Sequence, residues 1–135
     1  MPSGFVDTNI LIYAAAGAHD EPAKWARATD FLDGGPYAIS GQVLAEFYVN
    51  ATKKNVSLAE MERWLLLLDM FAFQPIDRAV VADGIVLSRR YRISYWDAAL
   101  IAAAKRLDER TLFTEDLNHG QTYDGVTVVN PLLEH

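Results

Sequence analysis

Four acidic residues stand out because their neighbours suggest a site. Asp7 lies in GFVDTNILIYA, Glu46 in LAEFY, Asp97 in SYWDAALIAAA and Asp116 in LFTEDLNHG. Carboxylates gathered at one place repel one another, and some of them would have to stay protonated. A divalent cation removes that cost, and all-oxygen ligands favour Mg²⁺ or Mn²⁺ over zinc. Such an ion can activate a water molecule as a nucleophile, which is the chemistry of phosphodiester hydrolysis.

Short apolar runs alternate with longer amphipathic segments along the chain. We expect strands near residue 5 and over residues 37–40, 71–76, 111–114 and 126–130. We expect helices after Asp7 and over residues 21–33, 42–54, 57–70, 77–90 and 94–106, several of which follow a Ser or Asp that can cap them. Strands separated by helices predict a single α/β domain with a mostly parallel central sheet flanked by helices.

This topology brings the four acids to one edge of the sheet. Asp7 and Asp116 directly follow strands, and ligand crevices of parallel sheets form at the carboxyl ends of the strands. Glu46 lies early in the helix that follows residues 37–40. Asp97 is in the first turn of a helix that runs antiparallel to the strands, so its N-terminus lies over the same edge.

Each acid also has an ordinary structural explanation. Asp7 can cap the helix that follows it, Asp97 can be the acid of a capping box, and Asp116 can be a turn residue. Glu46 belongs to a stripe spaced by four residues that is typical of a solvated helix face, made of Gln42, Glu46, Asn50 and Lys54. The prediction of a site therefore rests on the four acids jointly.

In this order the motifs resemble those of the PIN-domain ribonucleases, and most of all the VapC-type toxins of bacterial toxin–antitoxin pairs. The resemblance runs from Phe5 to Pro131. It implies a PIN domain over residues 1–132 with a five-stranded parallel sheet. It also implies that the four acids bind Mg²⁺ or Mn²⁺ for endonucleolytic cleavage of RNA, with Asp7 and Asp97 as the firmest metal ligands.

The same resemblance suggests supporting residues and partners. Asn9 and Thr114 match polar positions that support the acids, and Thr8 is a further candidate for this role beside Asp7. The family implies a homodimer and inhibition by a cognate antitoxin protein.

Composition limits the remaining possibilities. The 135 residues suit one domain, and a hydrophobic content of 51% is enough for a core. The chain has no cysteine, which excludes disulfides, thiol catalysis and Cys-based zinc sites. It shows no apolar run that could span a membrane and no signal peptide, so we expect a cytoplasmic protein.

Residues 133–135, which include Glu134 and His135, resemble the start of a purification-tag remnant.

The net charge of −6 argues against a nucleic-acid binder unless the contacts are local. Arg89, Arg90 and Arg92 precede the Asp97 helix and could grip RNA phosphates. Cations are also favoured at the C-terminus of any helix, which would explain these arginines equally well.

Residues 64–71, with the sequence WLLLLDMF, carry more consecutive apolar side chains than one buried helix face requires. Burial between two layers of the fold would explain them. A groove for an antitoxin segment, or part of a dimer contact, would explain them as well.

Other functions fit the motifs less well. A haloacid-dehalogenase-type phosphatase, which is the metal-dependent phosphatase alternative, requires a second Asp where this chain has Asn9. A response-regulator receiver requires adjacent acids after the first strand and a phosphoacceptor on a middle strand. A catalytically silent PIN-like domain that only binds a partner remains an alternative to the nuclease.

Overall fold

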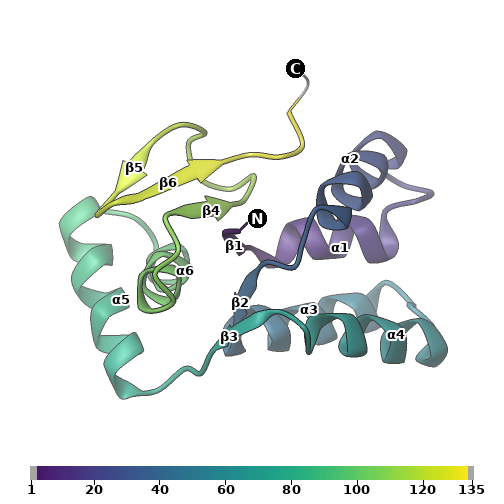
Figure 1. The fold of residues 1–135 in the computed structure, drawn as a ribbon, viewed down its shortest axis with the longest axis horizontal. Coiled ribbons are helices and arrows are strands. Elements are labelled where there is room, and N and C mark those ends of the chain that lie inside the picture. The colour runs from purple at the N-terminus through teal and green to yellow at the C-terminus, as the bar shows by residue number, and fades with distance from the viewer. Residues whose placement is uncertain (1–2, 134–135) are drawn as a thin grey trace.

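The computed structural model describes residues 3–133, and its centre is a six-stranded sheet in the order β3-β2-β1-β4-β6-β5 (Figure 1). The strands are β1 (Phe5–Val6), β2 (Ala38–Ser40), β3 (Ala72–Gln74), β4 (Thr111–Phe113), β5 (Thr122–Tyr123) and β6 (Val126–Val129). Every neighbouring pair is parallel except β5 with β6. The α/β class and the mostly parallel sheet are confirmed. The proposed tag residues Glu134 and His135 lie outside the described residues.

The five expected strands are present, and β5 is an addition that the sequence analysis did not anticipate. Tyr123 pairs with Val126, so only Asp124 and Gly125 connect β5 to β6. Their φ angles are 50° and 86°, and two positive values are typical of the tight turn that joins antiparallel strands. The expected count of five strands is therefore corrected to six, because this turn adds one short antiparallel strand at the edge.

Six helices surround the sheet in the described part of the chain: α1 (Thr8–Ala16), α2 (Pro22–Asp33), α3 (Gly41–Lys53), α4 (Leu58–Leu68), α5 (Arg78–Tyr91) and α6 (Tyr95–Arg106). The expected capping residues determine where several of them begin. Ser40, Ser57, Asp77 and Ser94 each accept a hydrogen bond from the backbone N–H three residues later. None of these helices is both long and apolar enough to cross a membrane.

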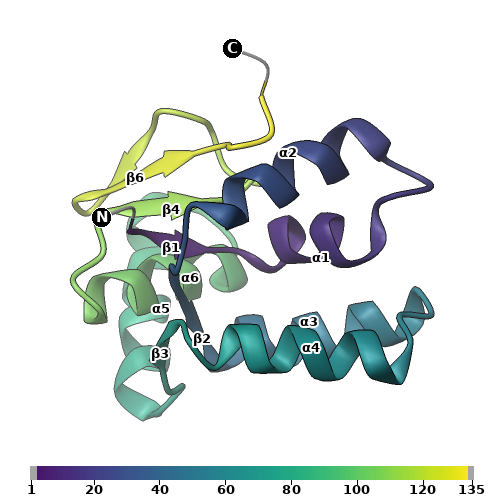
Figure 2. The ribbon, with the colours of Figure 1, turned by 45° about the vertical axis from the view of Figure 1, so that its right-hand side comes forward.

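Two helices leave the carboxyl edge of the sheet side by side. α1 continues from β1 and α3 continues from β2, and the two helices pack against each other (Figures 1 and 2). α2 packs on α1, while α4 follows α3 in the sequence and runs beside it in both views. Residues in the first turns of α1 and α3 are therefore neighbours beyond the sheet edge.

Helix α6 is the most buried helix and fixes the position of Asp97. Its residues from Ala98 to Ala104 are all buried against the sheet and against α5. At Gly84 on α5, a Cβ would lie 3.0 Å from the Tyr95 ring and 3.4 Å from Ala99 Cα, so glycine allows the two helices to cross closely. This packing holds the first turn of α6 in a defined place.

Candidate active site

Asp7 occupies the junction between β1 and α1, where it is only 6% exposed. Its backbone N–H donates to the carbonyl oxygen of Phe113 at 2.9 Å, which ties the junction to β4. Its Oδ1 accepts a 2.6 Å hydrogen bond from the Thr8 N–H, and its Oδ2 accepts a 2.8 Å bond from Thr114 Oγ1. Asp7 therefore caps α1 and is also a buried acid that faces the end of β4.

Thr114, which is fully buried, connects two of the acids. Its hydroxyl donates to Asp7, and the same oxygen accepts a 3.1 Å hydrogen bond from the Asp116 N–H. The Thr114 N–H donates to the carbonyl oxygen of Val129 at 3.1 Å, so the residue is anchored to β6 as well. This arrangement fixes the loop after β4 and holds Asp116 close to Asp7.

The electrostatics of Asp7 reflect both burial and neighbouring acids. Its pKa is raised from 3.8 to about 6, mainly by burial and to a smaller extent by the charges of Asp116 and Glu46. The hydrogen bonds from Thr114 and Thr8 favour the charged form and oppose this rise. Asp7 is thus held in a site where a negative charge is unfavourable unless a cation is present.

Asp116 links the remaining acid to this group. Its pKa is raised by burial first, and then by the charges of Asp97 and Glu115, while the Asn9 amide opposes the rise. Glu46 is exposed on α3, and Thr8 Oγ1 lies 3.5 Å from its Oε1, which is at most a weak hydrogen bond. The structure therefore relates the four acids in pairs at the carboxyl edge of the sheet, Asp7 with Glu46 and Asp116, and Asp116 with Asp97.

A cleft of about 620 Å³ opens between α1, α3 and the loop after β4, and we call it the acid cleft. It is lined by Asp7, Thr8, Asn9, Ile12, Tyr13, Glu46, Asn50, Lys53, Lys54 and Asp116. Asp97 lies beside it in the first turn of α6, close enough for its charge to act on Asp116. The cleft is the place where a ligand would meet the acids.

Several cleft residues were not among the predicted site residues. Asn50 and Lys54 belong to the stripe spaced by four that contains Glu46, and the structure shows that this stripe faces the cleft from Glu46 onward, whereas Gln42 does not line it. Their spacing was therefore a signal that could have found them. The positions of Lys53 and Tyr13 in the cleft depend on the packing of α1 beside α3, which the sequence pattern does not reveal.

A second hydrogen-bond network, at the side of the cleft, binds Glu115, the acid next to Asp116. Tyr13 donates its hydroxyl proton to Glu115, and Lys24 Nζ lies 3.0 Å from Glu115 Oε2 and 3.2 Å from the Tyr13 oxygen. The Glu115 hydrogen bond is the main reason that the pKa of Lys24 is raised. Glu115 is therefore neutralised by Lys24, whereas Asp116 faces the cleft and forms no ion pair with a cation among residues 3–133.

The donor set of the acid cleft suits a hard divalent cation. All its acidic groups are carboxylates. The Asn9 amide lies near enough to Asp116 to lower the pKa of that acid, but neither polar atom of the buried Asn9 carboxamide meets the geometry of a normal hydrogen bond in residues 3–133. No three acids or histidines in this range are close enough to hold an ion directly together. Mg²⁺ fits such a site, because it keeps several waters and uses one or two carboxylates.

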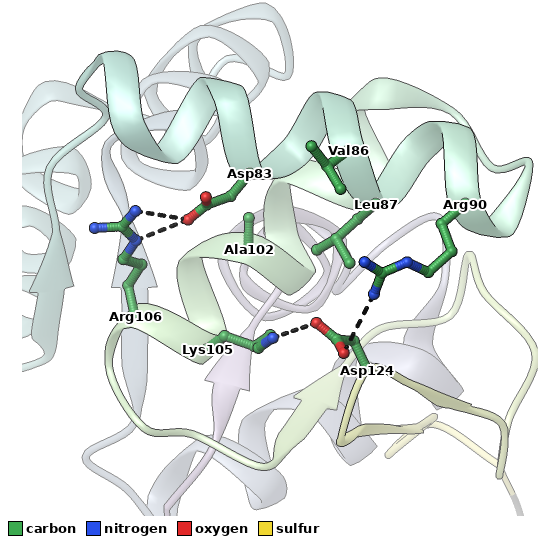
Figure 3. Close-up of a pocket in the computed structure, with 8 residues that line it drawn as sticks. All are labelled: Asp83, Val86, Leu87, Arg90, Ala102, Lys105, Arg106 and Asp124. Carbon is green, nitrogen blue, oxygen red and sulfur yellow. Dashed lines mark hydrogen bonds and ion pairs between the residues drawn. The ribbon is translucent and has the colours of Figure 1, made fainter.

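Arg90 lies in a different group of charges, which we call the paired-charge cluster (Figure 3). It surrounds a hollow of about 310 Å³ between α5, α6 and the turn before β6. Arg90 pairs with Asp124 at 3.5 Å, and Lys105 pairs with the same carboxylate. Arg106 pairs with Asp83 at 2.8 Å. Lys105 is the main cause of the lowered pKa of Asp124.

The paired-charge cluster and the acid cleft lie at opposite edges of the sheet. Asp124 precedes β6 at its amino end, whereas Asp7 and Asp116 follow the carboxyl ends of β1 and β4, and these strands are parallel. Arg90, one of the three arginines suggested for RNA binding, therefore lies away from the acid cleft. Arg89 and Arg92 are exposed, and neither lines the acid cleft.

The apolar run in α4 is only partly buried. Leu68 is buried, but Leu66 is 69% exposed, Leu67 is 42% exposed and Met70 is 70% exposed. A groove of about 510 Å³ separates α4 from α2, and its apolar lining includes Ala14, Trp25, Leu32, Trp64, Leu67, Met70 and Phe71. The run therefore borders an open apolar groove, the α2–α4 groove, and is not enclosed between two layers.

Comparisons with known proteins agree with this architecture. Among curated proteins, none matches the sequence. The structure is similar to a toxin–antitoxin complex from Klebsiella pneumoniae, with a TM-score of 0.70 and 25% identity over 95% of this chain and 97% of that chain. It is similar to FitAB bound to an IR36 DNA fragment, with a TM-score of 0.69 and 25% identity over 97% of each chain. VapBC2 from Rickettsia felis, bound to a promoter DNA fragment, shares the fold at a TM-score of 0.64 and 16% identity over 94% of this chain and 97% of that chain.

The sequence also matches a family model directly. The model of the PIN domain matches residues 4–124, a range that contains β1 to β5, all six described helices and the four acids. The chain belongs to the PIN-domain family.

Proposed function

We propose that the protein is a Mg²⁺- or Mn²⁺-dependent endoribonuclease that acts as the toxin of a toxin–antitoxin pair. The observation that carries the proposal is the buried Asp7, whose pKa is raised to about 6 beside Asp116 and Glu46 in an open cleft. Membership of the PIN family supports a nuclease. The similar solved structures, which include toxin–antitoxin complexes, support the role of toxin.

In this proposal the acids of the cleft have distinct tasks. Asp7 and Asp97 are the main metal ligands, while Asp116 and Glu46 complete the negative site. When bound, the divalent ion supplies positive charge to the scissile phosphate and promotes ionisation of water. Water attacks phosphorus, one P–O ester bond breaks, and the departing oxygen takes up a proton.

The surrounding polar residues would hold these acids in place. Thr114 fixes one oxygen of Asp7 and the backbone of Asp116 at the same time. The Thr8 N–H fixes the other oxygen of Asp7. The Asn9 carboxamide, which has buried polar atoms without a normal partner, would complete its hydrogen bonds with a water of the hydrated ion.

The test is cleavage of single-stranded RNA by the purified protein with Mg²⁺ or Mn²⁺, and with the ion removed by a chelator. We expect cleavage only with the ion, and none by Asp97→Asn. RNA cleavage that persists in the chelator would exclude the metal mechanism. A protein that binds an antitoxin but cuts no RNA with either ion would be the catalytically silent domain instead.

We further propose that a cognate antitoxin lies in the α2–α4 groove and that the free toxin is a homodimer. The groove and the acid cleft meet at α1, because Ala14 lines the groove while Ile12 and Tyr13 line the cleft. An amphipathic antitoxin segment could therefore fill the groove and extend a basic side chain to the acids. Such a side chain would form charge-assisted hydrogen bonds and compete with the metal ion.

Changing Leu66 and Leu67 to Ser tests the antitoxin surface. Leu67 lines the groove and Leu66 is the exposed residue next to it in the sequence. Both side chains are exposed, so the double variant should remain folded with the same metal-dependent cleavage. We expect antitoxin binding, measured by calorimetry with the protein encoded beside the toxin, to weaken about tenfold or more as apolar contact is lost. Exposed Leu58, at the start of α4 and outside the lining of the groove, provides the control Leu58→Ser. Equal antitoxin affinity in the double variant and the control would place the antitoxin elsewhere.

A further inference from the structure

We propose that Lys53 and Lys54, at the far end of α3, bind backbone phosphates of the RNA strand next to the phosphate that is cleaved. The inference rests on the proposed nuclease function, since it assigns the path of the substrate through the acid cleft. It replaces the three arginines suggested by the sequence, of which Arg90 lies at the opposite edge of the sheet.

The first argument is the geometry of α3. Glu46, Asn50 and Lys54 are spaced by four residues and line the same cleft, so they follow one face of the helix outward from the sheet. At 1.5 Å per residue, Lys54 lies about 12 Å along the helix from Glu46. Ile12 and Tyr13 of α1 form the facing wall. The cleft is thus an elongated groove with acids at its inner end and lysines at its outer end.

The second argument is the state of these charges. Within residues 3–133, neither Lys53 nor Lys54 forms an ion pair with an acid, although they share a cleft with three carboxylates. Lys24, at the side of the same cleft, is paired with Glu115. Two exposed cations at the outer end of an acidic groove are therefore available to an anionic ligand.

The third argument is what RNA requires from such a groove. The chain carries a net charge of −6, so it repels a polyanion at long range unless cations line the path. A metal ion at the acids would neutralise only the phosphate being cleaved. Neighbouring phosphates of a single strand need their own cations, which position the strand without reading its sequence.

The ordinary explanation is that lysines are favoured at the C-terminus of any helix. The same explanation applies to Lys105 and Arg106 in the last turn of α6, which belong to the paired-charge cluster. These two residues are matched to Lys53 and Lys54 in charge and in helix position, but they lie at the other edge of the sheet. They therefore provide the control that separates a helix-end role from a role in RNA binding.

The experiment measures RNA binding by protein that cannot cut, in the Asp97→Asn background with Mg²⁺. Fluorescence anisotropy with a labelled single strand of about 12 nucleotides is recorded over a range of KCl concentrations. Each phosphate contact on a single strand contributes about 0.7 to the slope of log affinity against log salt. We expect Lys53→Gln with Lys54→Gln to reduce that slope by about 1.4 if each lysine contacts one phosphate. Lys105→Gln with Arg106→Gln should leave it unchanged.

Cleavage by the protein that retains Asp97 gives an independent readout. The lysines contact phosphates that are not cleaved, so we expect the double Gln variant to raise KM about tenfold while kcat stays within about twofold. Lys53→Arg with Lys54→Arg keeps both charges and should restore the salt slope and KM. A purely structural role would change thermal stability without this split between KM and kcat.

The possible outcomes separate this inference from the nuclease function. If wild type cuts RNA but the double Gln variant keeps its salt slope and KM, the inference is wrong and the nuclease remains. An equal loss in the Lys105 and Arg106 control would show general charge attraction, which also overturns it. Weaker antitoxin binding with unchanged RNA binding would assign the lysines to the protein partner. If wild type neither binds nor cuts RNA, the proposed function fails and this inference fails with it.

Discussion

The acid cleft and the paired-charge cluster lie at opposite edges of one sheet, and their charges are arranged in opposite ways. In the paired-charge cluster Asp124 is bound by Lys105 and Arg90, and its pKa is lowered. In the acid cleft Asp7 and Asp116 face other acids, and the pKa of each is raised. The charges of the first cluster are paired within the chain, whereas the acids of the cleft repel one another, which is why we propose a cation there.

The difference has an energetic meaning. A pKa raised from 3.8 to about 6 means that the ionised Asp7 destabilises the metal-free fold by about 3 kcal/mol at neutral pH. That is a large share of the roughly 5–15 kcal/mol by which domains are stable. A buried, unpaired acid of this kind marks a functional site more strongly than a paired surface acid, whose contribution is about 0–1 kcal/mol.

The largest expected effect is on catalysis. Asp7→Asn should lower RNA cleavage at least about 100-fold, because it removes a proposed metal ligand and keeps the size of the side chain. Asp124→Asn should cut RNA at a rate within about twofold of wild type. Asn suits that position, since it tolerates the φ of 50° better than most residues. Initial rates with Mg²⁺ provide the measurement, and equal losses in the two variants would remove the distinction between the two edges.

Much of this contrast was readable from the sequence because its signals are local. Ser40, Ser57 and Ser94 mark helix starts, and the apolar runs mark the parallel strands. Parallel topology then determines that acids after strands meet at one edge. The stripe through Glu46 had the correct spacing, and only the packing of α1 beside α3 shows that it faces a cleft.

The structure adds most to the sequence where neighbours along the chain diverge in space. Arg90 precedes the Asp97 helix by a few residues, yet its side chain meets Asp124, which arrives from a turn far along the chain. The Asp124-Gly125 turn itself carries a hairpin signal, but residues 122–123 are too short a run to suggest a strand. Long-range pairing decided the position of Arg90, whereas the short length of β5 hid a local hairpin.

A second prediction concerns stability in the absence of metal. Below pH 3.8 Asp7 is protonated in both the folded and the unfolded chain, so Asp7→Asn should change the free energy of unfolding little through charge. As pH rises to about 6, only the unfolded chain loses the proton, so wild type loses stability and the variant does not. Above pH 6 the variant should be more stable by up to about 3 kcal/mol. Urea denaturation at several pH values in a chelator measures this.

Replacing Asp124 should change the free energy of unfolding in the opposite direction in the same measurement. Its lowered pKa stabilises the folded state above the unfolded pKa, and this contribution is lost as pH falls. Asp124→Asn should therefore be slightly less stable than wild type at neutral pH and should approach wild type in acid. If Asp7→Asn also proved less stable than wild type at pH 8 without metal, the acid cleft would not hold an unpaired charge.

The smallest predicted effect links metal binding to stability, because a metal ion should restore the stability that the unpaired acids remove. Mg²⁺ at millimolar concentration binds the folded acid cleft and not the unfolded chain, so it should raise the melting temperature at pH 7.5 by about 3 °C or more. The ion requires the ionised form of Asp7, whose pKa is about 6, so protons compete with it in acid. At pH 5 about one tenth of Asp7 would be ionised, and the affinity for Mg²⁺ should fall about tenfold.

Thermal melts with and without Mg²⁺ at both pH values measure this prediction, with two variants as controls. Asp97→Asn should lose most of the shift at pH 7.5, whereas Asp124→Asn should keep it, since that acid is already neutralised by Lys105. An equal shift at pH 5 and pH 7.5 would mean that Mg²⁺ binds acids with ordinary pKa values on the surface. In that case the raised pKa of Asp7 would be a property of its burial alone, and the acid cleft would lose its role as the metal site.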